Sequence, residues 1–195
     1  MSHEGKMSLK RCFVFVAFFT ERGKMNQIRK TILAGLLMAL GMMLPFVTGQ
    51  IPEIGSMLLP MHIPVLICGF FCGWKYGLVV GFVTPLLRSM LFGMPPILTA
   101  LAMAFELASY GVVTGLMNQL LAGKKFRLYI SLIVAMIAGR AVWGLVSLVI
   151  YGVTKTAFTW QIFIGGALLN AIPGIILQLI VVPGLVLAIE KNWSK

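Results

Sequence analysis

The sequence predicts an all-α membrane protein of six transmembrane helices with both termini in the cytoplasm. Hydrophobic residues make up 59% of the 195-residue chain, charged residues make up only 11%, and the mean hydropathy is +0.99. A soluble domain could not bury that much apolar surface. The apolar residues also fall into six runs, and most basic residues lie before the first run, in alternate connections or in the tail. Membrane spans with a defined orientation produce this pattern.

The six runs, taken at roughly 20 residues per span, are 31–47, 57–72, 76–92, 97–121, 128–151 and 162–189. The second and third are short and the last is long, so we expect tilt or broken ends. Pro60 and Pro64 flank His62 at the start of the second run. Proline removes an amide donor and disfavours helix in the residue before it, which predicts irregular backbone there. The polar connection 48–56 is either a cap over a site or a plain linker.

The basic residues set the orientation. Of 16 Lys and Arg residues, seven precede the first run, six lie in alternate connections or in the tail, and the opposite connections hold only Lys155. The positive-inside rule then places both termini in the cytoplasm. This topology signal accounts for the formal charge of +11. It therefore argues against a nucleic-acid partner and for membrane lipid as the surroundings.

The cysteines and the first 24 residues carry little chemistry. Cys12, Cys68 and Cys72 are odd in number and lack metal-ligand spacing, so we expect packing residues and neither a disulfide framework nor a metal site. The apolar run 12–19 is too short to span a membrane and has no cleavage signal after it. We expect residues 1–24 to be a loosely ordered or non-native extension and residues 25–195 to form the membrane domain.

Small residues recur four positions apart in several runs, and such ridges let helices approach closely in lipid. Bundle packing explains most of them. The first run is the exception, because Thr31, Gly35 and Ala39 form a ridge on the most N-terminal helix. That ridge predicts a contact with a separate membrane subunit.

Charged residues inside the runs point to the functional site. Arg88, Glu106 and Arg140 lie well within apolar runs, as does the polar Asn170. Charge in hydrocarbon is costly, so such residues face a protein interior or a watery cavity. Helical rise places all four in the outer half to the middle of the bilayer.

Helical spacing extends these positions into faces that suit an organic ligand. Tyr110 lies one turn from Glu106, and Trp143 lies one turn from Arg140. Aromatic rings with a few placed polar groups are typical of a small-molecule pocket. An ion path would show rings of like charge or exposed carbonyls, and the sequence predicts neither.

The charge count favours an anionic ligand. One carboxylate cannot neutralise two arginines, and planar arginine suits bidentate carboxylate binding. We expect Glu106 to pair with Arg88, which leaves Arg140 to hold the ligand. An ion pair that merely stabilises the bundle is the structural alternative. His62 is either a satisfied structural histidine or a ligand contact.

Catalytic motifs are not found in the sequence, so we expect no enzyme. The chain contains no Asp, no metal-spaced His/Glu pair, no nucleophile elbow and no P-loop. We expect no cofactor, and active transport by this chain would need energy from another subunit.

Four segments carry a resemblance to a known family: 61–77 (MHIPVLICGFFCGWKYG), 81–89 (GFVTPLLRS), 92–96 (FGMPP) and 104–111 (AFELASYG). The sequence resembles the substrate-binding S components of energy-coupling factor (ECF) vitamin transporters. It is most similar to the group that includes the pantothenate and folate S components. The resemblance extends over about residues 26–189, and its specific part is the middle block.

The resemblance implies a six-helix bundle in the cell membrane that binds a vitamin near the exterior face, under the loop between the first two helices. It also implies partners: one transmembrane coupling protein and two cytoplasmic ATPases, which together make an ABC-type importer. The family's first-helix motif for contact with the coupling protein maps onto Thr31, Gly35 and Ala39. The family usually has alanine in this motif, so Gly35 is a departure.

Pantothenate ranks first among the candidate vitamins because it carries one carboxylate. Folate, cobalamin and a hydroxymethylpyrimidine stay open. A competing interpretation is a six-span scaffold or assembly protein of the cell envelope without transport activity, in which the buried charges are only structural.

Overall fold

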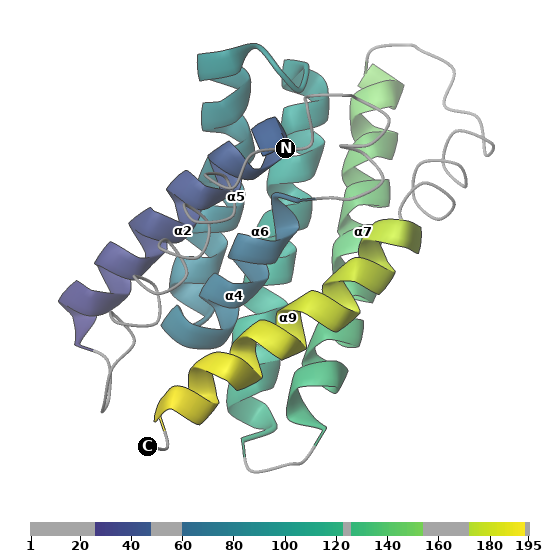
Figure 1. Ribbon diagram of the computed structural model, residues 1–195. Helices are drawn as coiled ribbons and strands as arrows, with labels where there is room; N and C mark the ends of the chain where they lie inside the picture. Colours follow the sequence, from purple (N-terminus) through teal and green to yellow (C-terminus); the bar gives the residue numbers. More distant parts are fainter. Residues whose placement is uncertain (1–25, 48–59, 123–125, 154–171, 194–195) are drawn as a thin grey trace.

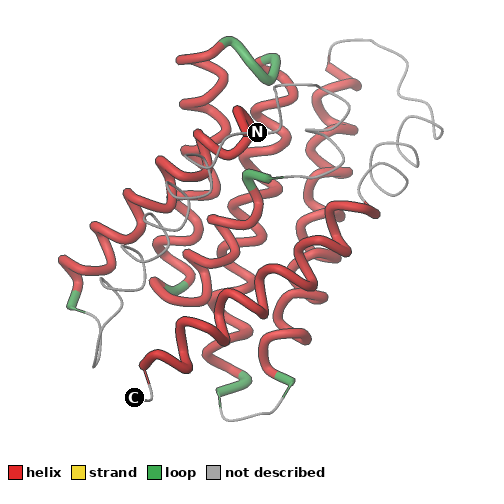
Figure 2. Tube along the Cα trace, in the orientation of Figure 1, coloured by secondary structure: helices red, strands yellow, loops and turns green. Residues whose placement is uncertain are grey.

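The computed structural model describes residues 26–47, 60–122, 126–153 and 172–193. In these ranges all regular structure is helical, with short turns between the helices (Figure 2). This confirms the predicted all-α class. The described helices are α2 (Gln27–Val47), α4 (His62–Cys72), α5 (Trp74–Phe92), α6 (Ile97–Leu120), α7 (Arg127–Val153) and α9 (Ile172–Trp193).

Four of these helices have the length and apolar composition to cross a membrane: Gln27–Phe46 of α2, α5, α6 and Arg127–Ile150 of α7. Helix α4 and the Gly174–Ile189 part of α9 are apolar but shorter. The six-span count and the cytoplasmic termini therefore stay predictions. The expected extension 1–24, the connection 48–56 and Asn170 lie outside the described residues.

Helix α4 is the central element of the bundle. Nine of its 11 residues are buried, and it packs against α2, α5, α6 and α9. In Figure 1, α2 lies on one flank, α7 on the other, and α9 slopes across the front of the bundle from beside α7 toward the C-terminus. One buried cluster joins α4 to α2 and α5, and it includes Cys68 and Cys72. These two cysteines are packing residues, as predicted.

The ends of α4 follow from its sequence. Pro60 and Met61 form a turn and the helix begins at His62. Met61 has helical dihedral angles (φ −67°, ψ −21°) and Ile63 is helical despite preceding Pro64, so the predicted irregular backbone is not seen at these residues. Pro64 falls in the first turn, where an amide hydrogen has no helical acceptor. Gly73 ends α4 and precedes α5 with a φ of 93°. Glycine adopts this conformation without steric cost, which permits a reversal within a single residue.

Helices α5 and α6 approach through their small residues. A Cβ built on Gly111 would overlap the backbone of Gly77, and one on Gly81 would overlap the backbone of Leu107. The predicted role of these glycines in bundle packing is confirmed. This close contact fixes α6 against α5 and holds one face of α6 toward the bundle interior.

Candidate functional site

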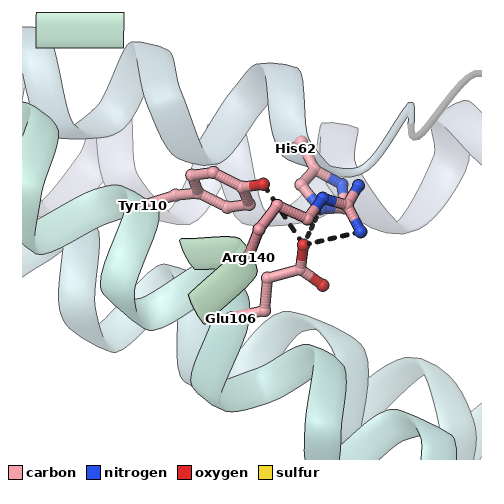
Figure 3. Close-up of polar contacts among 4 residues, drawn as sticks. All are labelled: His62, Glu106, Tyr110 and Arg140. Carbon is pink, nitrogen blue, oxygen red and sulfur yellow. Dashed lines mark hydrogen bonds and ion pairs between the residues drawn. The ribbon is translucent and has the colours of Figure 1, made fainter. Parts of the chain in front are cut away.

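Glu106 is the centre of a buried polar cluster formed by α4, α6 and α7 (Figure 3). Its side chain is 2% exposed. Tyr110, one turn later on α6, donates its hydroxyl hydrogen to Glu106 Oε1 at 3.2 Å. The prediction that these two residues share a face is confirmed. Helical spacing therefore places a carboxylate and a phenol side by side in the bundle.

Arg140 on α7 makes the ion pair with this carboxylate. Its Nη1 lies 3.2 Å from Glu106 Oε1, and dashed lines from several side chains converge on that oxygen in Figure 3. The expected pairing of Glu106 with Arg88 is wrong. The reason is the packing of α6 against α7, which brings Tyr110 onto Gly139 and so places the next residue, Arg140, at the level of Glu106.

Arg88 is satisfied at a different place. It is 5% exposed on α5 and donates from Nη1 to the carbonyl oxygen of Met42 on α2 at 2.8 Å. Its guanidinium carbon also lies 5.2 Å from the ring centre of Phe46 and 6.0 Å from that of Phe92. These two rings meet edge to face at 4.9 Å. A carbonyl and two ring faces therefore stabilise this charge without a carboxylate.

His62 lies beside the ion pair as the first residue of α4. It is fully buried, and its Nε2 lies 3.7 Å from Glu106 Oε1. Its ring meets the ring of Tyr110 at 5.1 Å with an interplanar angle of 67°. Neither ring nitrogen has a hydrogen-bond partner among the described residues. His62 is therefore close to the cluster but not satisfied by it.

Arg140 uses only part of its guanidinium group for Glu106. Its Nε and Nη2 atoms are buried and have no hydrogen-bond partner within the described ranges. These two N–H groups lie along one edge of the planar group, the edge that binds a carboxylate with two parallel hydrogen bonds. Each buried donor without a partner costs about 1–3 kcal/mol. The cluster thus presents donors in the geometry that a carboxylate or a carbonyl would satisfy.

Gly139 leaves the space that Tyr110 occupies. A Cβ on Gly139 would come within 2.8 Å of the Tyr110 ring. The ring therefore packs on bare backbone of α7, and its hydroxyl reaches Glu106. Gly139 is not among the predicted site residues, because only the pairing of α6 with α7 reveals its role.

The other predicted site residues lie as follows. Trp143 is half-buried, three residues after Arg140 on α7. Arg88 belongs to the contact with Met42 described above, and Asn170 is outside the described residues. Gln178 on α9 is not among the predicted site residues. It is 1% exposed, with an amide nitrogen that has no hydrogen-bond partner in the described part of the chain.

Thr31, Gly35 and Ala39 lie on an exposed face of α2. A Cβ on Gly35 would meet nothing within 4 Å. Large apolar side chains are exposed on the same helix, among them Ile28, Ile32 and Met43. The ridge therefore stays largely exposed among the described helices, with one polar contact from Thr31 to Tyr76 of α5.

Helix α2 is tied to α5 at both of its ends. Near its N-terminus the Tyr76 hydroxyl donates to the side-chain oxygen of Gln27 at 3.1 Å and lies 3.2 Å from Thr31 Oγ1. Near its C-terminus Arg88 holds the Met42 carbonyl. The exposed ridge thus lies on a helix that is fixed to its neighbour at two points.

Comparison with known protein families identifies the chain. The family model described as "ECF transporter, substrate-specific component" matches residues 29–186. The chain belongs to this family. Searches among curated proteins and among solved structures found no match.

As an S component, the chain is the substrate-binding subunit of an ECF transporter, and it is a membrane protein of a transporter family, not of an enzyme family. The matched range contains every described residue of the Glu106 cluster and the α2 ridge. Membership in this family favours the transporter interpretation over the envelope scaffold.

Proposed function

We propose that this S component binds a vitamin that carries a carboxylate, with pantothenate as the first candidate. The observation that carries the proposal is the Nε and Nη2 edge of Arg140, for which the described part of the chain offers no hydrogen-bond partner. A carboxylate would accept both hydrogens, while Glu106 keeps Nη1. His62, Tyr110, Trp143 and Asn170 are proposed to surround the bound vitamin.

The number of buried charges does not by itself favour an anionic ligand. Arg140 and Glu106 form a neutral pair, and the charge of Arg88 is stabilised at Met42 and the two rings. What favours a carboxylate is the direction of the unsatisfied donors. Folate also carries carboxylates and is second. Cobalamin and a hydroxymethylpyrimidine lack a free carboxylate and are disfavoured.

The assembly follows from the family. We propose that the chain spans the plasma membrane six times and has both termini in the cytoplasm. We also propose that it binds a transmembrane coupling protein, which in turn binds two cytoplasmic ATPases. Thr31, Gly35 and Ala39 are proposed as the docking ridge, which is supported by their exposure on α2 and by the open space at Gly35. A small-residue face permits close helix contact in lipid.

The decisive experiment is small-molecule mass spectrometry of the purified chain, followed by binding assays on two variants. We expect a carboxylate vitamin in the wild-type protein. Arg140→Ala removes both donors, and Arg140→Lys keeps the charge without the planar edge, so both should bind at least about tenfold more weakly. Arg88→Lys is the matched control, with unchanged affinity expected. A retained vitamin that binds equally well to Arg140→Ala would remove Arg140 from the site.

Co-purification tests the partners separately. The tagged chain should bring down one coupling protein and two ATPases from the native membrane, and Arg140→Ala should still do so. If the wild-type chain brings down only envelope assembly factors and holds no small molecule, the scaffold interpretation is correct.

A further inference from the structure

We propose that His62 selects for a carboxylate by taking up a proton when the ligand occupies the open edge of Arg140. This inference rests on the proposed function, because it assigns a role to a second residue of the same site. It begins from a buried histidine whose two ring nitrogens have no hydrogen-bond partner among the described residues. Such a group in a native interior needs an explanation.

Within the described ranges, the charged and titratable groups around His62 can be named. Glu106 and Tyr110 face it from α6, and Arg140 completes the cluster from α7. Of the ionisable side chains on α5, Arg88 lies against Met42, and Lys75 and Tyr76 lie in the first turn of that helix. Helix α2 carries only Arg29 and Lys30, both in its first turn, and α9 has no ionisable residue from Ile172 to Ile189.

Adding a ligand changes the balance of this cluster. With neutral His62, the Arg140 and Glu106 charges cancel. A bound carboxylate adds one negative charge in a buried place, where an uncompensated charge is costly. A proton from solvent on His62 restores neutrality, and Nε2–H then points toward Glu106 Oε1 at the observed 3.7 Å. A neutral imidazole has one ring nitrogen that can accept this proton.

Thermodynamic linkage between proton uptake and ligand binding makes the affinity for the ligand depend on pH. If binding is coupled to uptake of a proton, affinity falls as pH rises, by at most about tenfold per pH unit for one proton. A neutral ligand of the same shape gains nothing from the proton. His62 would therefore discriminate between a carboxylate and its uncharged analogue, and the discrimination would be stronger at lower pH.

Calorimetry in buffers of different ionisation enthalpy tests the proposal, with pantothenate as the probe and its alcohol analogue as the matched uncharged ligand. We expect fractional proton uptake with pantothenate at pH 7.5, none with the alcohol, and none with pantothenate on His62→Gln. Pantothenate binding without proton uptake, or with uptake retained in His62→Gln, overturns the proposal.

A second measurement tests the proposal if the protein does not bind pantothenate or if the His62→Gln variant does not fold. The sequence contains two histidines, His3 and His62, so nitrogen NMR of the histidine-labelled wild-type chain can follow His62 with His3 as an internal reference. Acetate then serves as a minimal carboxylate. A protonated fraction of His62 that increases with acetate at fixed pH supports the proposal, and one that does not change overturns it. Failure of pantothenate to bind would count only against the choice of vitamin.

Discussion

Gly77 on α5 and Gly111 on α6 lie backbone against backbone, so closely that a methyl group on Gly111 would overlap the Gly77 main chain. This contact holds in place the helix that carries Glu106 and Tyr110. In lipid, where no hydrophobic driving force joins two helices, such packing is a principal source of association.

Gly111→Ala should therefore destabilise the protein. Overpacking typically costs about 1–3 kcal/mol, which outweighs the gain of about 0.8–1 kcal/mol that alanine offers a helix. Gly35→Ala is the matched control, because nothing lies within 4 Å of its Cβ position. Thermal unfolding in detergent should show a lower midpoint for Gly111→Ala and an unchanged or raised one for Gly35→Ala. Equal midpoints would contradict the close approach.

The Glu106–Arg140 pair should show strong thermodynamic coupling. Removing one partner of a buried ion pair costs about 3–5 kcal/mol, because it leaves the other charge uncompensated. Glu106→Gln and Arg140→Met should each lower the free energy of unfolding. The double variant should lose less than the sum of the two, by about 0.5–3 kcal/mol. Chemical denaturation of the ligand-free protein measures this cycle, and strictly additive losses would mean that the pair is not formed.

Arg88 should matter for the attachment of α2 and not for the ligand. Arg88→Ala removes a charged hydrogen bond of about 1.5–3 kcal/mol and the contacts with the rings of Phe46 and Phe92. We expect a lower unfolding midpoint and faster proteolysis of α2. Arg88→Lys keeps the charge near the rings and should lose less. If Arg88→Ala instead abolishes vitamin binding and leaves stability unchanged, Arg88 belongs to the ligand site.

Gly139→Ala should disturb the site through Tyr110. The added methyl comes within 2.8 Å of the Tyr110 ring, so the ring must shift and its hydroxyl moves relative to Glu106. We expect destabilisation of about 1–3 kcal/mol together with weaker vitamin binding. Gly152→Ala on the same helix has open space around it and should change neither property. A Gly139→Ala protein with normal affinity would show that Tyr110 is not positioned by this contact.

Local patterns in the sequence predicted the structural features that depend on a single helix. Composition predicted the helical class, and helical spacing placed Tyr110 beside Glu106. Cross-helix features were not predictable in this way. The choice of Arg140 over Arg88 depends on the register of α6 against α7, which a single chain does not encode in any local pattern.

Arg88 shows a second limit of sequence reasoning. A count of charged side chains assumes that a buried arginine needs a carboxylate, yet the Met42 carbonyl and two aromatic rings stabilise this one. Backbone acceptors do not appear in the composition. Gln178 did give a signal, as a lone amide in an apolar run, but nothing local distinguished it from a packing residue.

The two attachments of α2 to α5 have a mechanical consequence. Tyr76 and Arg88 hold opposite ends of α2, so a force applied to the exposed ridge moves α2 and α5 together as one stiff unit. His62, Glu106, Tyr110 and Arg140 come from α4, α6 and α7. Because α5 lies backbone against backbone with α6, and α4 packs on both α2 and α5, a partner that holds the exposed ridge is mechanically linked to the helices that carry the Glu106 cluster.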